Sequence, residues 1–133
     1  MTFSVPGPPR GKGRPRFTRT GHSYTPKETV AYERQIRDAC KAVCAKRIEG
    51  PVRIFIKAYM SIPASASKRM REDMRLNIIR PTKKPDIDNV IKAVLDALNG
   101  LAYADDKNVV YVGASKWYAE EPSLEITIEE VSE

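Results

Sequence analysis

Alternation between hydrophobic and polar residues predicts the strands of this 133-residue chain. Four segments have the composition or spacing of strands: residues 2–5, 52–60, 108–118 and 124–129. The second segment places Val52, Ile54 and Ile56 on one face. Arg53 and Lys57 fall on the other face, which gives the two-residue period of a strand buried on one side.

Apolar residues spaced three and four positions apart predict two longer helices. The first covers residues 25–46 and the second residues 88–99, after which Gly100 favours a helix end. A short polar helix capped by a serine is expected over residues 65–75. The expected buried side chains are Val30, Ile36, Ala39, Cys40, Val43 and Cys44 in the first helix and Ile91, Val94, Leu95 and Leu98 in the second.

The order strand, helix, strand, short helix, helix, strand, strand predicts an α+β fold. The length fits a single small domain spanning residues 1–133. We expect a roughly four-stranded mixed sheet with the helices packed on one face. Residues 121–123, with the sequence Glu-Pro-Ser, indicate a hairpin turn between the last two strands.

Residues 6–24 form a basic loop with too many prolines and glycines for a helix. The net charge of the chain is +6, and residues 1–27 carry six Lys or Arg and no acid, which favours a polyanionic partner such as nucleic acid. Phe17 and Tyr24 could stack on an unpaired base. The alternative is a mobile, solvated arm that raises only non-specific affinity. The loop residues expected to contact DNA are Arg10, Lys12, Arg14 and Arg16.

No run of about 18 apolar residues is present, and the N-terminus lacks a hydrophobic signal region. We therefore expect a cytoplasmic protein without a membrane segment. Cys40 and Cys44 lie four residues apart in the first expected helix, and His22 is the only histidine. A zinc site is disfavoured because a second ligand pair is missing, and a disulfide is disfavoured in a cytosolic helix. We expect both cysteines to be packing residues.

Four aspartates gather in KPDIDNVIKAVLDALNG, residues 84–100, and AYADDKNVV, residues 102–110. Taken singly, Asp86 and Asp88 suit the first turn of a helix. Asp105 and Asp106 suit a turn. Taken together, carboxylates that converge on one site repel each other unless a cation lies between them. Hard oxygen ligands of this kind select Mg²⁺ or Mn²⁺.

Basic residues accompany these aspartates. Lys83 and Lys84 lie just before the first of them, and we expect both to bind DNA. Metal-assisted phosphodiester hydrolysis needs carboxylates for the ion and cations for the phosphate, so the spacing indicates a nuclease. Asp88, Lys92 and Asp96 follow one another at i, i+4 and form a polar stripe. Lys92 then has two roles open to it: an ion pair within the helix, or a cation that offsets charge on the phosphate.

The same residues resemble a known family. KPDIDNVIKAVLDALNG followed by DDKNVV is similar to the signature of the RusA-type Holliday junction resolvases. These are crossover junction endodeoxyribonucleases common in bacteria and their prophages. The stretch GKGRPRFTRTGHSYTPKETVAYE resembles the family's N-terminal loop and first helix, so the resemblance covers most of the chain.

The resemblance implies a homodimer of small α+β subunits that binds four-way DNA junctions. It implies symmetric, paired phosphodiester cleavage with Mg²⁺ or Mn²⁺ in DNA recombination and repair. Asp96 matches a family position with a supporting or secondary metal role. Carried over to this chain, the catalytic residues are Asp86, Asp88, Asp106 and Lys92, and the metal ligands are Asp86, Asp88, Asp106 and Asp105.

Three other functions remain open from the sequence. One is a less selective nuclease that acts on flaps or replication forks. Another is a junction-binding module without catalysis, in which a metal only neutralises charge. In the third, the carboxylates are ordinary helix caps and turn residues of a small protein.

Overall fold

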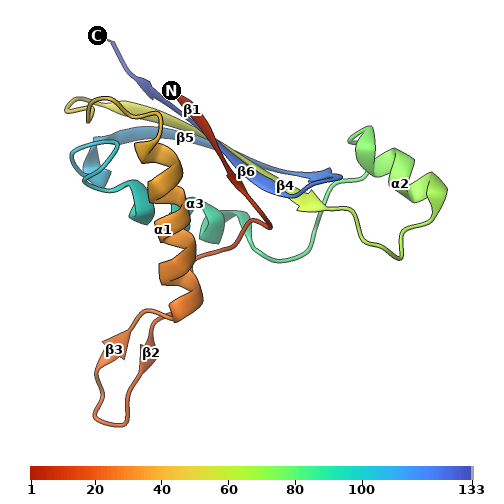
Figure 1. Ribbon diagram of the computed structural model, residues 1–133, viewed down its shortest axis with the longest axis horizontal. Helices are drawn as coiled ribbons and strands as arrows, with labels where there is room; N and C mark the ends of the chain where they lie inside the picture. The colour runs from red at the N-terminus through yellow and green to blue at the C-terminus, as the bar shows by residue number, and fades with distance from the viewer. Residues whose placement is uncertain (133) are drawn as a thin grey trace.

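Strand β4 (Val52–Ser61) organises the sheet. In the computed structural model, which describes residues 1–132, it lies between β5 (Val109–Ala119) and β6 (Ser123–Glu130), and β1 (Thr2–Pro6) pairs with the other edge of β6 (Figure 1). β4 runs parallel to β5 and antiparallel to β6, while β1 is antiparallel to β6. The expected single α+β domain with a four-stranded mixed sheet is confirmed.

The core lies on one face of this sheet. Alternate side chains of β4 are buried, and the register places Ile54 opposite Ile128. Ile56 lies opposite Ile126 in the same way. All four side chains are removed from solvent, and paired β-branched residues of this kind are the main stabilising contacts across neighbouring strands.

The last two strands do not form the expected hairpin, and this prediction is wrong. β5 and β6 are consecutive in the sequence, but β4 lies between them and pairs with both. The link over residues 120–122 therefore crosses the end of β4, where the N–H of Ile62 donates to the carbonyl of Ala119 at 3.3 Å. The physical reason is that β4 has the longest alternation of buried residues, and a central place lets both neighbours help to bury its apolar face.

Two helices cover the core face of the sheet (Figure 1). α1 (Lys27–Lys41) and α3 (Ile87–Leu98) pack against each other, and Arg37 Nη1 donates to the carbonyl of Ala97 at 3.0 Å. Within residues 1–132, no helix is both long and apolar enough to cross a membrane.

α1 is shorter than expected and presents a different side to the core. It ends at Lys41, because the chain then extends so that the N–H of Ile48 donates to the carbonyl of Ala102 at 2.9 Å. Val30 and Val43, both expected in the core, are 43% and 49% exposed. The buried residues of α1 are Thr29, Tyr32, Ile36 and Cys40.

The two cysteines are packing residues, as expected. Cys40 is fully buried in the core, Cys44 packs against it from a half-buried position, and both are free thiols. Burial raises the pKa of the Cys40 thiol to about 11, and the neighbouring Cys44 adds to the shift. The Cys40 thiol is therefore protonated and unreactive at neutral pH.

α3 also meets the core by a slightly different side than expected. Ile91 and Leu95, both predicted to be buried, are only half-buried. Ala93 and Ala97 take part in the buried side instead, since their small side chains let α1 approach closely, and apolar periodicity does not show this. The buried residues of α3 are Val90, Ala93, Val94, Ala97 and Leu98.

α2 (Lys68–Arg75) lies beyond the end of the sheet (Figure 1). The Ser67 hydroxyl caps it by accepting a hydrogen bond from the first turn at 3.2 Å, as the sequence predicts. After α2, the Arg80 guanidinium lies 3.4 Å from the centre of the Trp117 ring and donates twice to the carbonyl of Lys116. This contact covers part of the edge strand β5.

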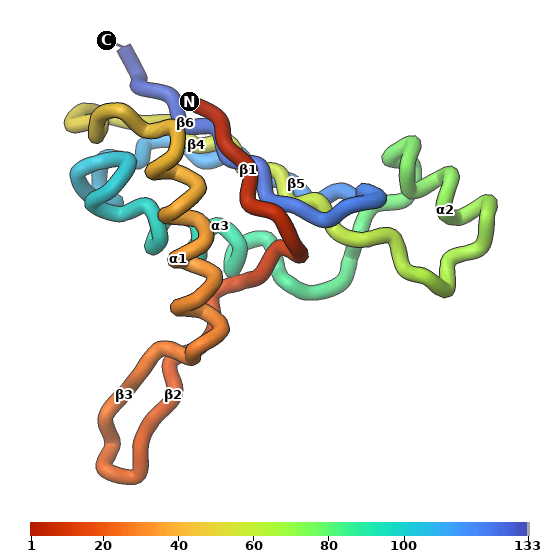
Figure 2. Tube along the Cα trace, in the orientation of Figure 1, coloured from red at the N-terminus to blue at the C-terminus, as the bar shows by residue number. Residues whose placement is uncertain are grey.

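The basic loop contains a small two-stranded ribbon. β2 (Arg16–Phe17) and β3 (Ser23–Tyr24) pair in antiparallel fashion and project away from the sheet and helices (Figure 1 and Figure 2). Phe17 is 71% exposed and Tyr24 48% exposed. The ribbon therefore presents aromatic and basic side chains to solvent.

The core assignment predicts the effect of a truncation in β6. Replacing the fully buried Ile126 by alanine leaves a cavity, so Ile126→Ala should lower the free energy of unfolding by about 2–5 kcal/mol in urea denaturation. Ile78→Ala is the matched control, because Ile78 is 67% exposed and its truncation should change stability by less than about 0.5 kcal/mol. Equal losses in the two variants would contradict the assignment.

Candidate functional site

The first turn of α3 carries two exposed carboxylates. Asp86 occupies the N-cap position, where its carbonyl accepts the N–H groups of Asn89 and Val90, each at 3.1 Å. The Asp86 side chain makes no capping hydrogen bond, so it does not do the work of a structural cap. Asp88 lies two residues further on, within the first turn, and is also exposed. Both carboxylates therefore remain available to a ligand.

A groove of about 650 Å³ adjoins Asp86, where the basic loop passes the start of α3. We call it the basic groove. Four of the six residues expected to bind DNA line it, and Asp86 is its one acidic lining residue. Its charged lining residues are Arg10, Lys12, Arg14, Lys84 and Asp86.

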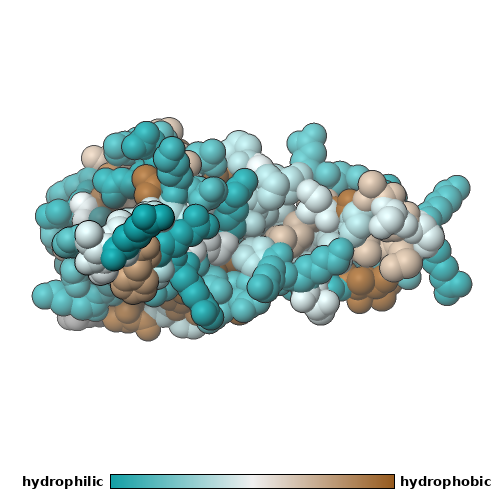
Figure 3. Space-filling view, turned by 90° about the horizontal axis from the view of Figure 1, so that it is seen from below, coloured by the Kyte–Doolittle hydropathy of each residue, from teal (hydrophilic) through white to brown (hydrophobic). Residues whose placement is uncertain are grey.

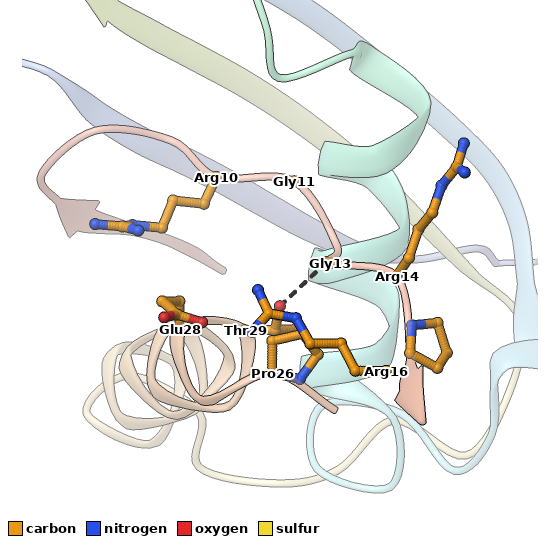
Figure 4. A pocket seen from close by; sticks show the side chains of 9 residues that line it. Arg10, Gly11, Gly13, Arg14, Arg16, Pro26, Glu28 and Thr29 are labelled. Atoms are coloured by element: carbon orange, nitrogen blue, oxygen red, sulfur yellow. Dashed lines mark hydrogen bonds between the residues drawn. The ribbon is translucent and has the colours of Figure 1, made fainter. Parts of the chain in front are cut away.

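The remaining expected DNA contacts, Arg16 and Lys83, lie outside the basic groove. Arg16 borders a neighbouring hollow of about 510 Å³ together with Arg10 and Arg14, between the loop and the start of α1 (Figure 4). Lys83 is exposed, and its carbonyl accepts a hydrogen bond from Lys116 Nζ. The molecular surface on the side toward which the ribbon projects is mostly hydrophilic (Figure 3).

A second group of carboxylates lies near the other end of α3. Asp105 caps the short 3₁₀ turn η1 (Asp106–Asn108), with its Oδ2 accepting the N–H of Lys107 at 3.0 Å. Asp96 of α3 is close enough to Asp106 to raise the pKa of the Asp106 carboxyl. Asp105 therefore has a structural task in addition to any role at a metal.

Tyr103 supports this second group and was missed by sequence reasoning. Its fully buried hydroxyl lies 2.7 Å from the carbonyl of Leu95 and 3.3 Å from Asp106 Oδ1. Burial raises the pKa of Tyr103 and the Asp106 carboxylate raises it further, so the phenol remains a hydrogen-bond donor. The only signal in the sequence was an aromatic residue two positions before the acidic pair.

The pKa of Asp106 is raised above its usual value. Asp106 is exposed as a residue, but partial desolvation of its carboxyl is the largest cause; the carboxylates of Asp96 and Asp105 add to it, and the hydrogen bond from Tyr103 opposes it. A carboxylate whose ionisation is disfavoured in this way is stabilised by a nearby cation. Asp106 is therefore suited to ligating a cation.

The four expected metal ligands are divided between the two ends of α3. Asp106 lies near Asp96, which is separated from Asp86 by roughly 15 Å of helix at 1.5 Å per residue. Across residues 1–132, no three His, Cys, Asp or Glu side chains lie close enough together to hold a metal ion. Lys92 lies on the exposed part of α3 between the two groups, and it is absent from the ion pairs that residues 1–132 form.

Lys12 reaches from the basic loop to the second acidic group. Its Nζ forms ion pairs with Glu33 of α1 and with Asp96 Oδ2, the latter at 3.2 Å. Burial lowers the pKa of Lys12, but the two carboxylates raise it more, so the net shift is upward. Sequence reasoning placed Lys12 among the DNA contacts and missed Glu33. No local pattern in the sequence marks Glu33, because its role comes from the contact with Lys12.

Comparison with known proteins assigns the chain to a family. The family model for the endodeoxyribonuclease RusA matches residues 6–129. The chain belongs to the RusA family. A curated protein of Bacillus subtilis (strain 168), the uncharacterized protein YqaN, is 40% identical to it over 143 aligned residues, which cover 99% of this chain and 97% of that protein.

The RusA match confirms the resemblance seen in the sequence. Both acidic groups, Lys92 and every charged residue of the basic groove fall inside residues 6–129. Membership of the RusA family gives the reaction class, which is endonucleolytic cleavage of DNA.

The raised pKa of Asp106 predicts a pH-dependent effect on stability. A carboxyl whose pKa is raised in the folded state stabilises the protein below its unfolded pKa and loses that contribution as the pH rises through the folded value. In EDTA, Asp106→Asn keeps an acceptor for Tyr103 and should raise the Tm at pH 7 by about 1–2 °C. The difference should vanish below about pH 4, where the carboxyl is protonated.

Thermal unfolding at the two pH values tests this prediction. Glu121→Gln, in the exposed link after β5, is the control and should leave the Tm unchanged at both. A lower Tm for Asp106→Asn at pH 7 would mean that the ionised carboxylate stabilises the fold instead.

Proposed function

We propose that this protein resolves four-way (Holliday) DNA junctions by cutting two opposed strands symmetrically, in DNA recombination and repair. The observation that carries the proposal is the basic groove, which Arg10, Arg14 and Lys84 line together with the exposed Asp86. Cations that hold a phosphate beside a free carboxylate are what phosphodiester hydrolysis needs. RusA family membership supports the reaction class, and the sequence resemblance supports the junction as substrate.

The groove and the ribbon together favour a branched substrate. Arg10 and Arg14 offer planar guanidinium groups that bind phosphate bidentately, which positions DNA without reading its sequence. The ribbon begins directly beyond the groove, at Arg16, and projects away from it. A second DNA arm that leaves the crossover at an angle could contact the ribbon while the first arm lies in the groove.

The proposed cofactor is Mg²⁺ or Mn²⁺. The available donors are hard carboxylate oxygens, and Mg²⁺ is commonly held by one or two carboxylates together with water and a substrate phosphate. Asp86 and Asp88 would hold an ion at the start of α3. Asp106 and Asp105 lie near the other end of the helix, too far away to share that ion, and would offer donors to a separate one. When bound, the ion supplies an activated water and stabilises the leaving oxygen.

Lys92 is the proposed catalytic cation. It is exposed on α3 between the two carboxylate groups, and residues 1–132 provide it with no ion-pair partner. This argues against the alternative role in a helix ion pair. A free ammonium group on the same helix as Asp86 and Asp88 can offset the charge that develops on the phosphate during cleavage.

We further propose that the active form is a homodimer. A four-way junction offers two equivalent strands related by a two-fold axis. A two-fold dimer supplies one site to each of them, and paired cuts follow from that symmetry.

The decisive assay is cleavage of a labelled synthetic four-way junction beside a linear duplex of the same sequence. The wild type should make paired, symmetric cuts in the junction with Mg²⁺ and none in EDTA. Asp88→Asn should reduce the rate at least 100-fold while leaving the Tm in EDTA unchanged, because the Asp88 side chain is exposed in the first turn of α3.

The other outcomes of this assay separate the competing functions. Equal cutting of duplex and junction would replace junction resolution by a broader branched-DNA or flap nuclease. Junction binding without cutting, with either metal, would leave only a binding module. Full activity of Asp88→Asn would remove Asp88 from the catalytic site.

The proposed phosphate contacts predict a change in salt dependence. Replacing Arg10 and Arg14 together by alanine removes two cations from the groove, so junction affinity should fall about tenfold at physiological salt. The slope of log affinity against log salt should drop by about 2. The control is Arg47→Ala, whose side chain pairs with Glu49 far from the groove, and it should change neither quantity. An unchanged slope in the double variant would rule out direct contact.

A further inference from the structure

Three successive residues of the basic loop, Gly11, Lys12 and Gly13, are seated between α1 and α3. The N–H of Lys12 donates to the carbonyl of Asn89 on α3 at 2.9 Å. The N–H of Gly13 donates to Thr29 Oγ1 on α1 at 3.1 Å, the bond drawn in Figure 4. The loop is therefore fixed to both helices at this point, even though the ribbon beyond it is free.

The two glycines allow this seating because the helices leave no room for a side chain. A Cβ at position 11 would lie 2.8 Å from the Cβ of Asn89, and a Cβ at position 13 would lie 2.5 Å from Thr29 Oγ1. Both separations are too short for real atoms. The backbone at Gly11 and Gly13 can thus approach the helices only without side chains.

Lys12 provides the third attachment through its side chain. Its Nζ pairs with Glu33 of α1 and with Asp96 of α3, so that a single ammonium group joins both helices. The Lys12 side chain is only 18% exposed and that of Glu33 20% exposed. Ion pairs shielded from water to this degree are lost at a much greater cost than those on an open surface, because one charge is then left unpaired.

These attachments determine where the flanking arginines lie. Arg10 and Arg14 leave the seated segment on opposite sides, as Figure 4 shows, and both line the basic groove that contains Asp86. If the segment came loose, the arginines would lose their fixed distance from Asp86. DNA binding would then have to include the cost of ordering the loop.

From this geometry we infer that Lys12, together with Glu33 and Asp96, is a positioning residue that locks the arginine-bearing loop across the groove before DNA arrives. Its task is to hold Arg10 and Arg14 beside Asp86, and its ammonium group does not itself bind a phosphate. Two carboxylates already occupy that ammonium, which leaves little of it accessible. The effect on DNA rests on the proposed function, whereas the locked loop does not.

The lock also assigns a role to Asp96. Its carboxylate raises the pKa of Asp106, so an unpaired Asp96 would add repulsion to the second acidic group. Pairing with Lys12 offsets that charge. Asp96 therefore serves as an anchor of the loop, which accounts for its place in the polar stripe of α3.

The test uses amide hydrogen exchange without DNA and junction binding in EDTA. In Lys12→Met, the Gly13 amide should exchange roughly tenfold faster than in the wild type, because the segment opens locally. Junction affinity in EDTA should fall about fivefold, while the cleavage rate at saturating junction, measured separately with Mg²⁺, changes less than about twofold. Lys12→Arg should restore slow exchange and most of the affinity. Lys41→Met, at the exposed end of α1, is the matched control and should alter neither.

A double-mutant cycle identifies the partner. If Lys12 acts through its two carboxylate partners, then Glu33→Gln should show part of the loss seen in Lys12→Met, because the pair with Asp96 remains, and the double variant should be no worse than Lys12→Met alone. Additive losses would overturn the lock. Should Lys12→Met fail to fold, Glu33→Gln carries the exchange measurement instead, with Lys12→Arg as its slowly exchanging comparison.

The remaining outcomes are equally decisive. Unchanged exchange at Gly13 in Lys12→Met would overturn the proposal, whatever happens to activity. Unchanged exchange with weaker binding and a salt slope lower by about 1 would show that Lys12 is a phosphate contact. If Lys12→Met exchanges faster but the wild type cleaves no junction, the lock is supported and only the proposed function is refuted.

Discussion

The burial of one side of α3 is the constraint on which the rest of this structure depends. Val94 and Leu98 are removed from solvent against the sheet, and the small Ala97 lets α1 lie close beside the helix. A helix has a fixed repeat, so choosing its buried side also chooses the side that faces outward. Asp88 and Lys92 are therefore presented to solvent by the same contacts that hold the domain together.

The distribution of charge follows from the same arrangement. Carboxylates placed at both ends of one helix repel each other far less than carboxylates crowded into one cluster, since the repulsion falls with distance and with hydration. Each group also has a basic neighbour: Lys84 beside Asp86 in the groove, and Lys12 against Asp96. The chain can thus fold with its acidic residues in place and still present them to a cation.

Sequence reasoning predicted the features that depend on a local pattern of residues. It missed the features that depend on contacts between distant segments of the chain. Strand β4 was evident because its alternation lies within a few residues. The position of β4 between β5 and β6 was not evident, because strand pairing depends on which neighbour best covers β4. The aspartates and loop arginines were found by motif and composition. Tyr103 and Glu33 were missed, because each acquires its role from a contact with another part of the chain.

The ribbon of β2 and β3 lies outside all of these constraints. None of its residues belongs to the core, and its exposed strands contact little besides each other. Lengthening or shortening such a projection changes the entropy of loop closure only slowly, so folding stability tolerates it. The ribbon can therefore change in length and composition without a penalty to the stability of the scaffold.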